Sequence, residues 1–135
     1  MKLLLAAFLA AHALIHVSYL TPAPPRTAGG PEWPFEMARS WTVAATRVDP
    51  QLVRAIGSVL VIATIVLLAA AALASLGWVV PASAWPLLVV AGATASAITL
   101  VVFFDPWIVL GLAIDAGLLW AAIAAGWSPA AISPS

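Results

Sequence analysis

The chain has 135 residues, of which 64% are hydrophobic and only 7% are charged. A soluble domain carries about 25% charged residues, so this composition excludes an ordinary soluble domain and indicates one small integral membrane domain, residues 1–135. Five basic and five acidic residues balance each other, and no basic block or cysteine is present. The sequence therefore predicts no nucleic-acid partner, no disulfide bond and no thiolate ligand.

The first hydrophobic segment predicts a membrane-spanning helix over residues 2–20. The proline-rich segment 21–25 ends this helix, because proline lacks an amide hydrogen and disfavours helix in the residue before it. A signal peptide is the alternative interpretation, with Lys2 as the basic residue before a short apolar core. Two ionisable residues in the segment, His12 and His16, favour a helix that is retained in the membrane.

Three further apolar segments, 52–76, 85–104 and 106–127, predict three more spans. A helix of about 20 residues is roughly 30 Å long, which matches the hydrocarbon thickness of a bilayer. Asp105-Pro106 predicts a tight turn between the last two spans, because aspartate is a favoured N-cap and proline fits the first helical position. The predicted fold class is therefore all-α: a four-helix transmembrane bundle in a multi-pass protein of the cell membrane.

A long loop over residues 21–51 is predicted to join the first two spans. Residues 33–41 within it can form a short interfacial helix, and an irregular loop with aromatic anchors is the alternative. Trp33 and Trp41 favour the membrane interface, where aromatic rings with a polar edge accumulate. Together with Glu36, they make this segment a candidate lid over the polar residues of the first span.

The arginines indicate how the bundle is oriented in the membrane. All four lie in the long loop or at its end, Arg26, Arg39, Arg47 and Arg54, against Lys2 on the other side. Short loops rich in lysine and arginine stay on the cytoplasmic side. We therefore expect the long loop to face the cytoplasm.

Three polar residues of the first span, His12, His16 and Tyr19, are spaced i, i+4 and i+7, so they share one helix face. Asp115 in the fourth span is their predicted partner, because it and His12 each lie about nine residues, roughly 13 Å, from the same membrane edge. Ionisable side chains at this depth are costly and are typical of functional sites, although a helix-packing hydrogen bond is the structural alternative. The predicted ligand or proton site consists of His12, His16, Asp115 and Tyr19.

Three kinds of chemistry fit these residues. His12 and His16, one turn apart, can hold a divalent metal with Asp115 as the third ligand. A quinone head group between the first and fourth helices is the other cofactor that we consider. A proton relay needs only histidines and carboxylates that face a hydrated cavity.

The last span contains Leu110-Gly111-Leu112-Ala113-Ile114-Asp115. With four spans in this length of chain, it resembles the small four-helix bacterial membrane proteins grouped as DoxX-like. Some members of that family are linked to quinone or thiosulfate redox chemistry, so the resemblance implies a role of that kind. The first span lacks the arginine and glycine pattern associated with the family, and no functional residue is carried over.

Two functions stay open at this point. The first is a small-solute or proton-linked carrier, or an accessory subunit of a membrane complex, which the small size and the absence of catalytic motifs favour. The second is a metal- or quinone-binding component of a membrane oxidoreductase. The expected partners are the lipid bilayer and either a second copy of the chain or a larger membrane complex.

Overall fold

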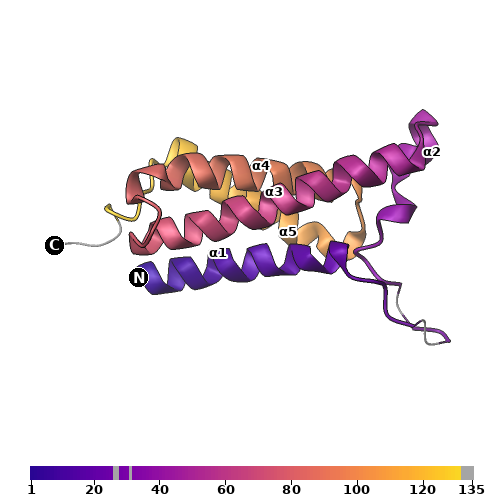
Figure 1. The fold of residues 1–135 in the computed structure, drawn as a ribbon, viewed down its shortest axis with the longest axis horizontal. Helices are drawn as coiled ribbons and strands as arrows, with labels where there is room; N and C mark the ends of the chain where they lie inside the picture. Colours follow the sequence, from indigo (N-terminus) through magenta and orange to yellow (C-terminus); the bar gives the residue numbers. More distant parts are fainter. Residues whose placement is uncertain (26–27, 31, 132–135) are drawn as a thin grey trace.

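Four long helices dominate the computed structural model, which describes residues 1–25, 28–30 and 32–131 (Figure 1). Within this part of the chain there is no β-strand. The four helices are long and apolar enough to cross a membrane: Lys2–Leu20, Pro50–Leu76, Ala82–Val102 and Pro106–Ala124. The predicted fold class, an all-α four-helix transmembrane bundle, is confirmed.

Each span consists of an α-helix, alone or with shorter helical turns at its ends. The first is α1 (Lys2–His16) followed by the 3₁₀ turn η1 (Val17–Leu20), and the second is α3 (Pro50–Leu76). The third is the 3₁₀ turn η3 (Ala82–Ala84) followed by α4 (Trp85–Val102). The fourth is the 3₁₀ turn η4 (Pro106–Ile108), α5 (Val109–Leu119) and the π turn η5 (Trp120–Ala124).

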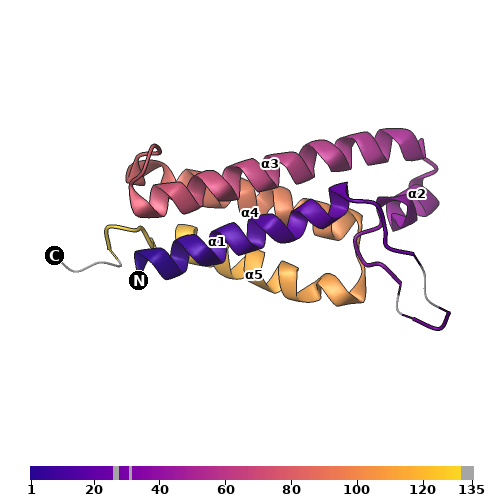
Figure 2. The ribbon, with the colours of Figure 1, turned by 60° about the horizontal axis from the view of Figure 1, so that its bottom comes forward.

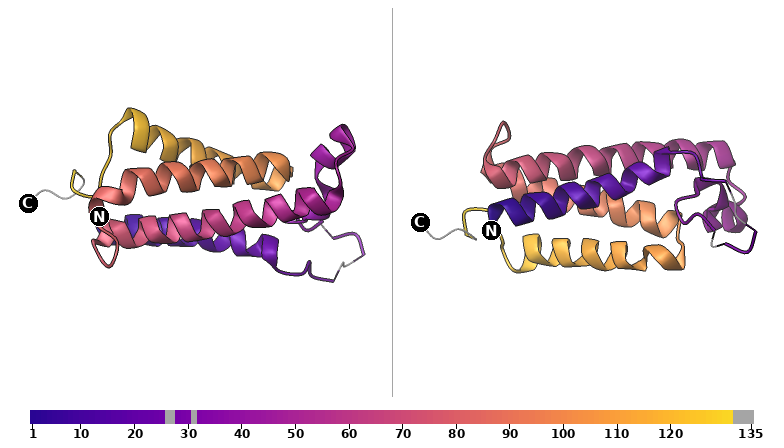
Figure 3. Two further views of the ribbon diagram at one scale, coloured as in Figure 1. Left: turned by 45° about the horizontal axis from the view of Figure 1, so that its top comes forward. Right: turned by 90° about the horizontal axis from the view of Figure 1, so that it is seen from below.

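The helix α3 is the centre of the bundle, because it packs along both α1 and α4, and α5 packs along α4 (Figures 2 and 3). Small residues permit these close contacts, as expected where helices associate in a membrane. At Gly92 of α4, for example, a Cβ atom would lie only 2.8 Å from Cδ2 of Leu68 in α3.

The fourth span is packed less tightly than the others. Of the residues of α5, only Asp115 and Leu118 are buried. Large apolar side chains such as Leu110 and Ile123 are exposed, as they would be against lipid. One of the two buried residues of α5 is therefore an acid, and its partners must come from the neighbouring helices.

The connection between α1 and α3 is partly helical, and we call the end of the bundle that carries it the loop edge (Figure 1). It contains the 3₁₀ turn η2 (Met37–Arg39) and the short helix α2 (Trp41–Thr46). Of the two alternatives for residues 33–41, a single short helix is therefore wrong, because only Met37–Arg39 are helical before α2 begins at Trp41. Ser40 interrupts the segment with an extended backbone (φ −60°, ψ 125°) while its Oγ donates a hydrogen bond to the carbonyl of Val102 (2.7 Å). Arg26, one of the arginines used for the orientation, lies outside the described residues.

The turn between α4 and α5 depends on Asp105, whose Oδ1 accepts a hydrogen bond from the amide of Trp107 (2.9 Å). The predicted cap is confirmed. Replacing Asp105 with alanine should lower the free energy of unfolding by about 1 kcal/mol, the usual loss when a helix cap is removed. Unfolding with a denaturing detergent would measure this. Asp105→Asn retains the acceptor and should stay near wild type, so equal losses in both variants would contradict the cap's role.

Candidate functional site

The buried face of α1 brings two histidines into the bundle. His12 is 3% exposed and His16 is 1% exposed, whereas Leu14 and Ile15 between them point outward. The i, i+4 spacing causes this separation, because residues four apart lie above one another on a helix. Asp115 of α5 is fully buried, so three ionisable side chains lie inside the membrane-spanning part of the fold.

His12 and Asp115 are in direct contact. Nε2 of His12 lies 2.8 Å from Oδ1 of Asp115, across two helices that are far apart in the sequence. The carboxylate oxygen accepts, so Nε2 of His12 carries the hydrogen. The contact between these two residues, which was predicted from their similar depth in the membrane, therefore joins α1 to α5.

His16 is held at both of its ring nitrogens. Nδ1 lies 3.0 Å from the backbone carbonyl of His12, which can only accept, so Nδ1 must carry a hydrogen. Nε2 lies 2.9 Å from Oγ of Ser96 on α4. This fixes the ring edge-on to that of His12, with the ring centroids 5.2 Å apart.

Ser96 of α4 completes the set, and it is absent from the site that the sequence predicts. Its Oγ donates to Oδ2 of Asp115 at 2.5 Å, and Ser96 is fully buried. We call His12, His16, Ser96 and Asp115 the polar network. It runs across three helices in the order His12, Asp115, Ser96, His16.

The hydrogens of the polar network can be counted. Ser96 has one hydroxyl hydrogen, so it cannot donate to Asp115 and to His16 at once. If it donates to an ionised Asp115, Nε2 of His16 must donate to Ser96, and His16 is a cation. If Asp115 is protonated and donates to Ser96, the hydroxyl donates to a neutral His16. With one proton fewer, lone pairs of Ser96 and His16 or Asp115 face each other. With one proton more, Asp115 and His16 both donate to Ser96, whose own hydrogen then lacks an acceptor, and both of these arrangements cost free energy.

These two arrangements carry the same net charge and differ in where one proton resides. In the first the proton is on His16, and in the second it is on Asp115. The path between them needs two transfers over hydrogen bonds of 2.5 Å and 2.9 Å through the Ser96 hydroxyl. The polar network therefore has the connectivity of a proton relay.

The surroundings of the polar network differ at its two ends. Away from the loop edge it meets a packed apolar cluster that includes Leu9, Leu68 and Val89. Toward the loop edge lies Tyr19, whose ring centroid is 6.3 Å from that of His16. Its hydroxyl is buried and has no hydrogen-bond partner among the described residues. The polar side of the site therefore continues toward the loop edge.

A cavity of about 290 Å³ lies beside the polar network, between α1 and α5. We call it the seam cavity. Its wall is mostly apolar, and it includes His12, His16, Tyr19, Trp107 and Ile114.

The three residues of the predicted lid, Trp33, Glu36 and Trp41, make different contacts. Trp33 packs against Phe35, with ring centroids 5.2 Å apart, and the ring of Phe35 meets that of Tyr19 at the same distance. Glu36 caps η2 by accepting a hydrogen bond from the amide of Ala38 (3.3 Å). Trp41 instead donates from Nε1 to the carbonyl of Val101 on α4 (2.7 Å) and is half exposed.

The metal site predicted from His12, His16 and Asp115 is not supported by the geometry. Within residues 1–25, 28–30 and 32–131, no three histidine, aspartate or glutamate side chains are grouped so that they could hold a metal ion. The physical reason is that both nitrogens of His16 and Nε2 of His12 already face hydrogen-bond partners. Sharing a helix face brought the side chains together without making them converge on one point.

Fold and site together define a small multi-pass membrane protein with a hydrogen-bonded polar network inside its helix bundle. Comparison with protein-family models, with curated protein sequences and with solved structures finds no match to this chain. The resemblance to the DoxX-like proteins stays a prediction.

Proposed function

We propose that the protein is a proton-linked carrier of the cell membrane, in which the polar network takes up and releases one proton in each transport cycle. The observation that carries this proposal is the hydrogen count at Ser96, which leaves one proton shared between Asp115 and His16. A helix-packing contact needs only one hydrogen bond between neighbours. A continuous chain through a serine hydroxyl that ends in two ionisable groups is suited to moving a proton.

The position of the polar network supports the same proposal. Tyr19 and the connection above it lie between His16 and the loop edge, whereas the apolar cluster around Leu9 and Leu68 closes the other side. Protons would therefore enter and leave from the loop edge in this conformation. Arg47 and Arg54 at this edge favour its cytoplasmic placement.

Ser96→Ala tests the relay, because it removes the hydroxyl that links Asp115 to His16. We expect vesicles that contain the variant to take up protons at the rate of empty vesicles, measured with an internal pH dye under an imposed pH gradient. Ser75→Ala is the matched control: Ser75 is equally buried, and its Oγ donates only to the carbonyl of Ala71 (2.9 Å). This control should retain the wild-type rate.

The wild-type protein should be measured without solute and then with external amino acids, phosphorylated amines and organic acids. A carrier should accelerate proton uptake in at least one of these conditions. Rates equal to those of empty vesicles in all of them would contradict the proposal, as would equal losses in Ser96→Ala and Ser75→Ala.

Binding of a quinone is a second candidate, and the seam cavity is the observation that favours it. The cavity is apolar, and beside it lies Tyr19, whose hydroxyl has no partner among the described residues. A further cavity of about 740 Å³ continues along the same two helices toward Met1, and Ile114 lines both. The smaller space suits a head group and the larger one an apolar tail. Quenching of tryptophan fluorescence by a short-chain quinone in wild type, but not in a variant with Ile114→Trp, would support this function.

A further inference from the structure

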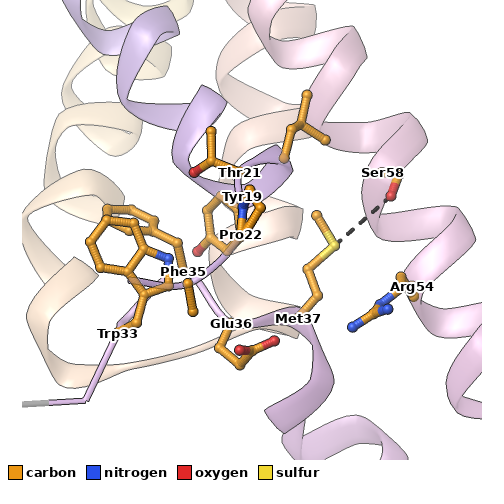
Figure 4. A pocket seen from close by; sticks show the side chains of 11 residues that line it. Tyr19, Thr21, Pro22, Trp33, Phe35, Glu36, Met37, Arg54 and Ser58 are labelled. Carbon is orange, nitrogen blue, oxygen red and sulfur yellow. Dashed lines mark hydrogen bonds between the residues drawn. The ribbon is translucent and has the colours of Figure 1, made fainter. Parts of the chain in front are cut away.

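A separate pocket lies at the loop edge, between the end of α1, the chain before η2 and the first turns of α3 (Figure 4). We call it the interfacial pocket. Its volume is about 420 Å³, which lies at the lower end of the roughly 300–1,000 Å³ typical of small-molecule sites. It shares Tyr19 and Phe35 with the wall of the seam cavity and contains no residue of the polar network.

Two opposite charges face the interfacial pocket without neutralising each other. Glu36 and Arg54 both line it, and Figure 4 shows them on opposite sides of the Met37 side chain. Within the described part of the chain, no ion pair joins Arg54 to an acid. The pocket therefore offers one anionic and one cationic group to whatever enters it.

The two ends of the interfacial pocket differ in the side chains that line them. The rings of Trp33 and Phe35 lie on the side away from Arg54 (Figure 4), with Glu36 between. Aromatic faces beside a carboxylate attract an ammonium group. At the other end, the guanidinium of Arg54 is the group best suited to a phosphate, which it can bind with two parallel hydrogen bonds.

Tyr19, which lines both this pocket and the seam cavity, provides a second indication of a ligand. It is 6% exposed, lines the interfacial pocket, and has a hydroxyl without a hydrogen-bond partner among the described residues. A buried hydroxyl that lacks a partner costs free energy unless something binds it. An oxygen atom of a ligand in the pocket would satisfy it.

We infer that the interfacial pocket binds a zwitterion that carries an ammonium and a phosphate group. The ammonium lies against Glu36 and the aromatic rings, and the phosphate is bound by Arg54. Such a ligand is the head group of an ethanolamine phospholipid or free phosphoethanolamine, which share this chemistry. The pocket lies at the membrane edge, among aromatic side chains of the kind that sit at head-group level. The inference is independent of the proton-linked function.

Binding is tested on the purified full chain in a neutral detergent, free of phospholipid and at one pH without a gradient. Phosphoethanolamine is titrated calorimetrically, and phosphatidylethanolamine and phosphatidylglycerol are compared by native mass spectrometry. Arg54→Gln should weaken zwitterion binding at least about tenfold, as expected when a hydrogen bond to a charged group is lost. Arg47→Gln, which removes the same charge outside the pocket, should leave it unchanged. Glu36→Gln should weaken phosphoethanolamine but not inorganic phosphate.

Each outcome decides the inference. Binding of the free zwitterion, of the lipid or of both supports it and identifies the source of the head group. Failure of both to bind would overturn it, and so would equal effects of Arg54→Gln and Arg47→Gln. Phosphatidylglycerol bound as tightly as phosphatidylethanolamine would show an anion site instead and would also overturn it. The three variants change exposed or half-buried side chains, so the fold should tolerate them.

Discussion

Replacing Asp115 with asparagine is expected to abolish proton uptake while the bundle stays folded. The amide oxygen can still accept from Nε2 of His12, and the amide NH₂ can donate to Ser96, whose hydroxyl then donates to a neutral His16. This hydrogen-bond pattern is the same as that of the protonated Asp115. The variant therefore holds the polar network in one of its two arrangements, because an amide cannot exchange the proton.

Asp115→Leu separates this functional effect from a structural one. Leucine leaves Nε2 of His12 and the hydroxyl of Ser96 without their partner, so two hydrogen bonds are lost. Hydrogen bonds between membrane helices average about 0.6 kcal/mol, so we expect a loss of about 1 kcal/mol in the free energy of unfolding. Unfolding with a denaturing detergent measures stability, and the vesicle assay measures proton uptake. If Asp115→Asn took up protons like wild type while only Asp115→Leu was destabilised, Asp115 would have a structural role alone.

The spans could be predicted because their signals are local in the sequence. A run of about 20 apolar residues requires a helix in a bilayer, since backbone groups there have no water to bind. Prolines and the cap at Asp105 then set the ends of the helices. The connection before α3 was harder, because its conformation depends on a contact with α4. Ser40 donates to the carbonyl of Val102, and no local pattern indicates that partner.

The contact between His12 and Asp115 could be predicted because depth in the membrane is readable from helical rise. Ser96 was missed as a partner because serine is common at packed helix contacts. A signal was present: Ser96 lies nine residues before Asp105, and Asp115 lies nine residues after Pro106, so the two face each other across the hairpin. The metal site that the spacing predicts has no support in the geometry, for a reason that spacing cannot show. The directions of the ring nitrogens are set by the backbone carbonyl of His12 and by α4.

The second large effect is expected at Gly57 of α3, where α3 meets the end of α4. A Cβ atom at Gly57 would overlap the ring of Phe103, which is buried and packs toward Tyr19. Because the ring of Phe103 is buried and packs toward Tyr19, it has little room to move away from the added methyl group. Gly57→Ala should therefore lower the free energy of unfolding by about 1–3 kcal/mol, the usual cost of overpacking a core. Unfolding with a denaturing detergent would measure the loss.

Gly117→Ala is the matched control, because Gly117 is also inside a helix but has no atom within 4 Å of the added Cβ. Alanine favours helix over glycine by up to about 1 kcal/mol, so this variant should match wild type or exceed its stability. Phe103→Leu removes the ring and leaves room for the added methyl group. The loss of stability from Gly57→Ala should therefore be smaller in that background than in wild type, since the effects of substitutions at contacting residues do not add. Equal stability of Gly57→Ala and Gly117→Ala would contradict the close contact between α3 and Phe103. It would also show that this contact does not hold the Phe103 ring against Tyr19.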